Sequence, residues 1–139
     1  MLTEKDYCDY DTCVALKELG YKVPTSAYYM PNNNQLIFVS NPFRGGYVTD
    51  CFYSHNSLPK DVMTANFIDA PTLWEAQKWL REEFELYMSA NFLITEEGDF
   101  EYEIETRTGY DNLSSNMYKT YEEALSEGIK EAVKILAIC

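Results

Sequence analysis

The segment EEGDFEYEIETR, residues 96–107, alternates acidic residues with aromatic and aliphatic ones. Successive side chains of a β-strand point to opposite faces, so a period of two separates an apolar face from an acidic face. The apolar set is Phe100, Tyr102 and Ile104, and the acidic set is Glu101, Glu103 and Glu105. Alternation of this kind is typical of an antiparallel sheet that packs on a core with one face and meets water with the other. The pattern therefore predicts such a sheet in the second half of the chain.

The strand FEYEIET (100–106) has a hairpin partner in ANFLIT (90–95). A loop with an even number of residues would place Ile94 opposite an acidic residue. An odd loop, Glu97–Asp99 or Thr95–Asp99, instead pairs apolar residues with apolar residues, so the sequence predicts an odd loop. The residues that then face the glutamates, none of them basic, are Asn91, Leu93 and Thr95.

Three amphipathic helices are predicted from capping residues and apolar periodicity. The first covers about Thr12–Leu19, between the cap candidates Asp9 and Asp11 and the helix-ending Gly20. The other two each begin with a capping box, in which a threonine cap precedes a glutamate by three residues. The boxes are Thr72 with Glu75 and Thr120 with Glu123, and the two helices continue to about Tyr87 and about Ala137.

Each of the last two helices carries a single apolar stripe with helical spacing. The stripes consist of Leu73, Ala76, Leu80, Phe84 and Tyr87, and of Tyr121, Leu125, Gly128, Ile129, Ala132 and Leu136. A helix with one buried face lies on a sheet rather than inside a bundle. Gly128 contributes no side chain to its stripe, which predicts a close approach to a neighbouring backbone.

Further strands are predicted before the second helix. SAYYM (26–30) and QLIFV (35–39) flank the turn signal PNNN, YVTDCFY (47–53) follows Gly45–Gly46, and TANFI (64–68) is a candidate short strand. The element order is then α-β-β-β-(β)-α-β-β-α. We predict one α+β domain, residues 1–139, with about five or six antiparallel strands and three helices packed mainly on one face.

The charge of the chain restricts its partners. The formal net charge is −12, and nine carboxylates lie between Glu82 and Glu105 without a single Lys or Arg. Such a charge disfavours nucleic acid and anionic membrane surfaces and leaves a basic protein as the candidate partner. No apolar run approaches the roughly 18–20 residues that span a bilayer. The start MLTEKDYCDYDT lacks the apolar stretch of a signal peptide, so we expect a cytoplasmic protein.

The cysteines and the single histidine are the remaining reactive groups. Cys8, Cys13, Cys51 and Cys139 are expected to be reduced thiols in the cytoplasm. Cys8-x4-Cys13 with Cys51-x3-His55 is an alternative zinc site, but its spacing is wider than that of structural zinc motifs, so no metal or cofactor is predicted. Any Ser–His or Cys–His catalytic pair must use His55, whose SHNS context matches no nucleophile motif. We therefore predict no enzymatic activity.

The acidic row itself has two interpretations. Alternate residues of a strand are about 6.5–7 Å apart, close to the phosphate spacing of a nucleic-acid strand. Glu101, Glu103 and Glu105 could therefore bind cations or a basic protein, or could occupy a nuclease site as a mimic of DNA. The favoured interpretation is the solvated face of a strand. Trp74 is a second candidate contact for a partner, although a rim residue that covers a hairpin is favoured there.

The segment TLWEAQKWLREEFELY, followed by a hairpin and by YKTYEEALSEGIKEAVKIL, resembles a group of small uncharacterised proteins from gut Bacteroidetes and their phages. The matching positions are Thr72, Leu73, Ala76, Lys78, Trp79, Leu80, Arg81 and Glu82, then Tyr118, Thr120, Glu122 or Glu123, and Ala124. The resemblance covers about half of the chain, and residues 1–60 do not take part. It implies a compact α+β domain and a phage or mobile-element origin, without catalytic residues to transfer.

The sequence thus predicts a non-catalytic accessory protein of a phage or prophage that acts through protein–protein contacts. One alternative is an acidic inhibitor that mimics nucleic acid and blocks a nuclease or another DNA-binding protein. An alternative of another class is a small hydrolase that uses His55 or the carboxylates of Glu101, Glu103 and Glu105.

Overall fold

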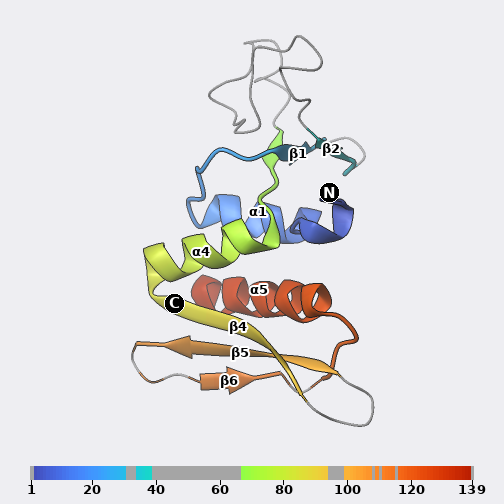
Figure 1. Ribbon diagram of the computed structural model, residues 1–139. Helices are drawn as coiled ribbons and strands as arrows, with labels where there is room; N and C mark the ends of the chain where they lie inside the picture. Colours follow the sequence, from blue (N-terminus) through green and yellow to red (C-terminus); the bar gives the residue numbers. More distant parts are fainter. Residues whose placement is uncertain are drawn as a thin grey trace. The chain divides into compact units, whose positions relative to one another are not determined.

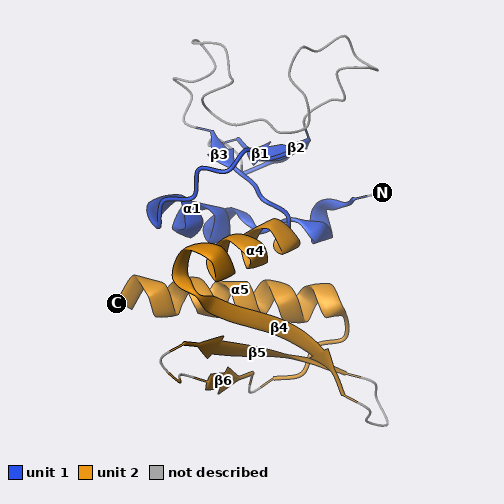
Figure 2. Cartoon of the chain, turned by 60° about the vertical axis from the view of Figure 1, so that its left-hand side comes forward, with its two compact units in different colours: residues 1–72 blue, residues 73–139 orange. Residues whose placement is uncertain are grey.

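The computed structural model describes residues 2–30, 34–38, 67–93, 99–107, 109, 111–114 and 116–138. Within these residues the chain forms three α-helices and two antiparallel sheets of three strands each (Figure 1). This confirms the predicted α+β class and, in outline, the predicted order of elements. The expected strand at 47–53 lies outside the described residues. The chain divides into two compact units, residues 1–72 and 73–139 (Figure 2), and the single domain stays a prediction.

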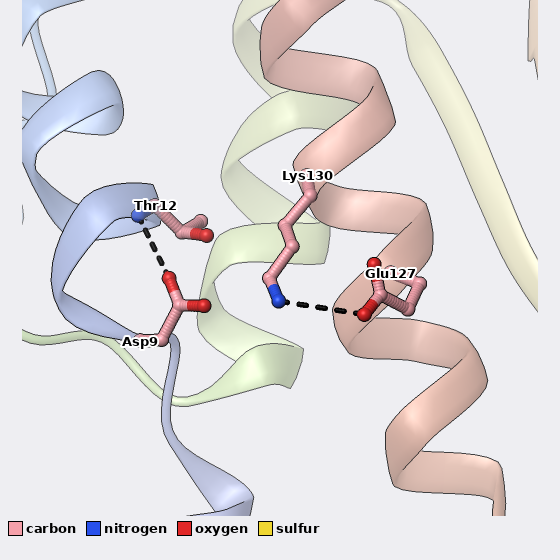
Figure 3. Close-up of polar contacts among 4 residues, drawn as sticks. All are labelled: Asp9, Thr12, Glu127 and Lys130. Atoms are coloured by element: carbon pink, nitrogen blue, oxygen red, sulfur yellow. Dashed lines mark hydrogen bonds and ion pairs between the residues drawn. The ribbon is translucent and has the colours of Figure 1, made fainter.

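Helix α1 (Tyr10–Glu18) of the first unit has well-defined ends. The Asp9 carboxylate caps it by accepting a hydrogen bond from the Thr12 backbone N–H at 2.8 Å (Figure 3). At the other end Gly20 has a φ of +104°, a left-handed conformation that a residue without Cβ adopts readily. The Tyr21 N–H then donates to the Leu16 carbonyl oxygen at 2.9 Å. The predicted cap residues Asp9 and Gly20 are confirmed.

The sheet of the first unit has the order β2-β1-β3. The strands are β1 (Ala27–Tyr29), β2 (Leu36–Phe38) and β3 (Ile68–Asp69). The predicted hairpin of β1 and β2 is confirmed, and Asn34 adopts a φ of 55° in the turn between them. Ala27 and Tyr29 are buried, and α1 packs against β3.

In the second unit, helix α4 (Leu73–Phe84) begins where its threonine predicts but ends early. The sequence predicted a helix to about Tyr87; instead Glu85 takes a φ of 52° and strand β4 (Leu86–Phe92) follows at once. The prediction was wrong because the segment 86–92 also alternates between apolar and polar residues. This segment pairs along seven residues with the neighbouring strand β5 (Phe100–Thr106), and the hydrogen bonds to β5 hold its backbone as a strand. Phe84 and Tyr87 are consequently 36% and 46% exposed rather than part of a buried stripe.

The sheet of the second unit has β5 (Phe100–Thr106) at its centre, between β4 and β6 (Asp111–Leu113). Phe92 pairs with Phe100 and Ala90 with Tyr102, so apolar residues face apolar residues as predicted. The register differs from the one that either predicted loop would give. Seven residues separate Phe92 from its partner Phe100, whereas the predicted loops have three or five. Strand β6 was not predicted.

Helix α5 (Tyr121–Ile138) lies along one face of this sheet (Figure 1). Its predicted cap is confirmed, since the Thr120 hydroxyl accepts a hydrogen bond from the Glu123 N–H at 3.1 Å. A Cβ on Gly128 would lie 2.8 Å from Met88 Sδ and 3.1 Å from Tyr102 Cβ. The predicted close approach at Gly128 is therefore real, although the atoms it meets belong to side chains of β4 and β5.

Candidate partner-binding face

The outward face of the second sheet is the candidate site. Directly paired residues of antiparallel strands project on the same side of the sheet, so the register defines this face. We call it the glutamate face; it consists of Glu101, Glu103 and Glu105 of β5, Tyr87, Ser89 and Asn91 of β4, and Asp111 and Leu113 of β6. On the opposite side of β5, Ile104 is 0% exposed. The predicted orientation, with glutamates outward and apolar residues inward, is confirmed.

The glutamate face is open to solvent. Tyr87 is 46% and Leu113 53% exposed, and Glu105 and Asp111 are also exposed. Glu101 and Glu103 are half-buried. Helix α5 packs against β4 and β5, and Gly128 places it on the side of Met88 and Tyr102, opposite the glutamates. The sheet thus keeps one face on a core and leaves the other available for contacts.

No positive charge belongs to this face within the described strands β4, β5 and β6. Arg107, which follows β5, forms an ion pair with Glu85 at 3.2 Å. Lys119 pairs with the Asp99 carboxylate at 2.9 Å, and Lys130 of α5 pairs with Glu127 at 3.4 Å (Figure 3). These three cations have acidic partners outside the glutamate face, and the described strands β4, β5 and β6 contribute no cation to the glutamate row.

Three carboxylates gather at one end of the face. Oxygen atoms of Glu103, Glu105 and Asp111 all lie within 4.8 Å of one another. Oxygen ligands of this kind suit hard divalent cations, but exposed acidic groups commonly lie this close without an ion. We therefore interpret the trio as a concentration of negative charge rather than as a metal centre.

Residues on two strands of the glutamate face were missed from the sequence, Asp111 and Leu113 of β6 and Tyr87 and Ser89 of β4. Asp111 lies on the unpredicted strand β6, and Tyr87 was assigned to a helix. A signal for β6 existed in Gly109, whose φ of +97° forms the turn before the strand. The alternation of Leu86, Tyr87, Met88 and Ser89 was the corresponding signal for β4.

Trp74, the other candidate contact residue, is 38% exposed near the start of α4. It therefore lies on a different element from the glutamate face and is not part of it. The second tryptophan, Trp79, is half-buried and packs edge-on against Phe84, with ring centroids 5.3 Å apart.

The structure brings Cys8 and Cys13 together in the first unit. Both are 1% exposed, and the Cys13 Sγ donates a hydrogen bond to the Cys8 carbonyl oxygen at 3.5 Å. Cys8 directly precedes the capping residue Asp9, and Cys13 is the fourth residue of α1. Apolar side chains at these two positions often pack against each other at the start of a helix. Cys51 and His55 lie outside the described residues, so the zinc and hydrolase alternatives are not tested by this pair.

Burial should make these thiols unreactive. Burial raises the pKa of the Cys13 thiol well above its ordinary value, and nearby Cys8 raises it further. Because both thiols are buried from the reagent, we expect iodoacetamide at pH 8 to label Cys8 and Cys13 at least about tenfold more slowly than in denaturant. Peptide mapping by mass spectrometry measures both rates.

The same pKa shift predicts a pH dependence of stability. The folded state holds the Cys13 proton more tightly than the unfolded state does. The contribution of this proton to the free energy of unfolding is therefore complete below the ordinary pKa of a thiol. The free energy of unfolding should then fall as the pH rises above about 8.5. In the iodoacetamide experiment, equal labelling rates in the folded and denatured protein would contradict the buried position of both thiols.

Comparisons of this chain with protein-family models, with curated proteins and with solved structures find no match. Among the described residues, no helix combines the length and the hydrophobicity of a membrane span.

Proposed function

We propose that the protein is a non-catalytic accessory protein that acts through protein–protein contacts and binds a basic partner on the glutamate face. The observation that carries this proposal is the aligned row of Glu101, Glu103 and Glu105 on a sheet face to which the described strands β4, β5 and β6 contribute no basic residue. Like charges on one face of a sheet cost stability. A partner that brings positive charge to this face would relieve that cost.

The proposed setting is the cytoplasm of a bacterium that carries a phage or prophage. It is supported by the resemblance of the α4 and α5 sequences to small proteins of gut Bacteroidetes and their phages. The genes next to this one provide the check, because tail, capsid, replication or anti-defence neighbours would each point to a different partner.

Replacing Glu101, Glu103 and Glu105 together with glutamine is expected to weaken binding of the captured basic partner at least about tenfold. Glutamine keeps the shape of the side chain and removes its charge, and it replaces one acceptor oxygen of the carboxylate with an NH2 donor. The tagged protein is used to capture partners from a bacterial extract, and calorimetry with the purified partner then measures the dissociation constant.

The matched control is Glu18→Gln, Glu82→Gln and Glu83→Gln, which changes the net charge equally at exposed positions outside the glutamate face. This control should retain binding. An equal loss in both triple variants would reduce the effect to net charge, and unchanged binding in the glutamate-face variant would remove the proposal.

A second candidate is supported by the spacing of the row, which is close to that of phosphates. In this case the partner is a nuclease or another DNA-binding protein, and the glutamate face occupies its DNA site. Duplex DNA should then displace this protein from the captured partner in competition. A partner that binds both at the same time would exclude mimicry and leave the first proposal standing.

A further inference from the structure

The structure of the glutamate face also indicates what kind of basic surface it fits. We propose that it binds an extended, arginine-containing segment of a partner protein, with arginines at alternate positions, an inference that rests on the proposed function. The occupant is deduced from the geometry of the row, from its neighbours and from its charge.

The geometry favours a single extended chain. Glu101, Glu103 and Glu105 lie in one line along β5, with about 6.5–7 Å between successive members. Residues i, i+2 and i+4 of an extended segment repeat at the same interval, so Arg-x-Arg-x-Arg can place one guanidinium over each carboxylate. Neutral residues border most of the row, with Asn91 and Ser89 opposite Glu101 and Glu103 on β4.

The neighbours favour arginine over lysine. Tyr87 of β4 pairs with Glu105, and Leu113 of β6 pairs with Glu103. Both are about half exposed, at 46% and 53%. A guanidinium can stack on the Tyr87 ring while it binds the adjacent carboxylate in a bidentate manner, and Leu113 can cover an aliphatic stem. An ammonium group is more strongly hydrated and forms neither the stacked nor the bidentate contact as well.

The charge excludes the pairing of two glutamate faces, and the net charge of −12 disfavours a second copy of this chain as the occupant. Two glutamate faces in contact would oppose Glu101, Glu103, Glu105 and Asp111 to the same four carboxylates without a cation between them. Such like-charge contacts suppress association. The occupant is therefore a different, basic chain.

The test compares three acetylated and amidated peptides of equal charge. In the first, three arginines alternate with threonine; in the second, the same residues place the arginines consecutively; in the third, lysine replaces arginine in the alternating pattern. Amide chemical shifts of the isotope-labelled full-length protein report both the site and the affinity at physiological salt.

We expect the alternating arginine peptide to shift amides of β4, β5 and β6 and to bind about two- to threefold more tightly than the consecutive one. An exposed ion pair contributes about two- to threefold in affinity. Of three consecutive arginines only the first and third share a face, so one of the three pairs is left unmade. The lysine peptide should also bind more weakly. Tyr87→Thr should reduce the preference for arginine over lysine.

Glu101→Gln with Glu103→Gln and Glu105→Gln should abolish the shifts, whereas Glu18→Gln with Glu82→Gln and Glu83→Gln should preserve them. Equal affinity for the alternating and consecutive peptides, or shifts outside the glutamate face, would overturn the inference. If the alternating peptide fails to bind while capture of a basic protein still requires the three glutamates, this inference falls and the proposed function stands. If neither depends on the glutamates, both fall.

Discussion

Replacing Ile104 with alanine is expected to lower the free energy of unfolding by about 2–5 kcal/mol. Ile104 is 0% exposed at the centre of β5, where it pairs with Met88 of β4 and Asn112 of β6. Truncation removes buried apolar surface and leaves a cavity, because the two flanking strands and α5 limit how far the surroundings can collapse. Denaturant unfolding followed by tryptophan fluorescence measures the change, since both tryptophans, Trp74 and Trp79, lie on α4 of the same unit.

The neighbouring residue provides the matched control. Glu105→Ala changes the next position of the same strand, but its side chain is exposed on the glutamate face. We expect less than about 0.5 kcal/mol from this change. Comparable effects at both positions would contradict the in-and-out alternation on which the candidate site depends.

Gly128→Leu is expected to destabilise the second unit by about 3 kcal/mol through overpacking. A Cβ at this position already approaches Met88 Sδ to 2.8 Å and Tyr102 Cβ and Cγ to 3.1 and 3.2 Å. The methionine side chain can move aside, but the Tyr102 Cβ is attached to the central strand. Leucine is the better helix former by about 0.8 kcal/mol, so a net loss of stability must come from the contact between α5 and the sheet.

Lys134→Leu is the control for this substitution, because Lys134 is exposed on the same helix. Its stability should change by no more than about 0.5 kcal/mol. Gly128→Ala should lie between the two leucine variants, since its propensity gain offsets part of the steric cost. A Gly128→Leu protein as stable as the Lys134→Leu protein would mean that α5 does not pack as closely as described.

Local sequence patterns accounted for both ends of α1, for the start of α5 and for the direction of the β5 side chains. Asp9, Gly20 and Thr120 act on backbone groups within a few residues, so their roles do not depend on the rest of the fold. The alternation of residues 100–106 likewise separates glutamates from apolar residues wherever the strand lies. The row of glutamates that forms the candidate site was therefore predictable.

Tertiary pairing decided the rest of the glutamate face. Residues 85–87 fit the end of a helix and the start of a strand equally well, and β5 selected the strand by pairing with it along seven residues. That choice turned Tyr87 outward beside Glu105, and the return of the chain as β6 added Asp111 and Leu113. Likewise, only the folded chain showed that Arg107 is engaged by Glu85. Periodicity determines on which side of its own strand a residue lies, whereas strand pairing joins distant segments and therefore determines which residues become its neighbours.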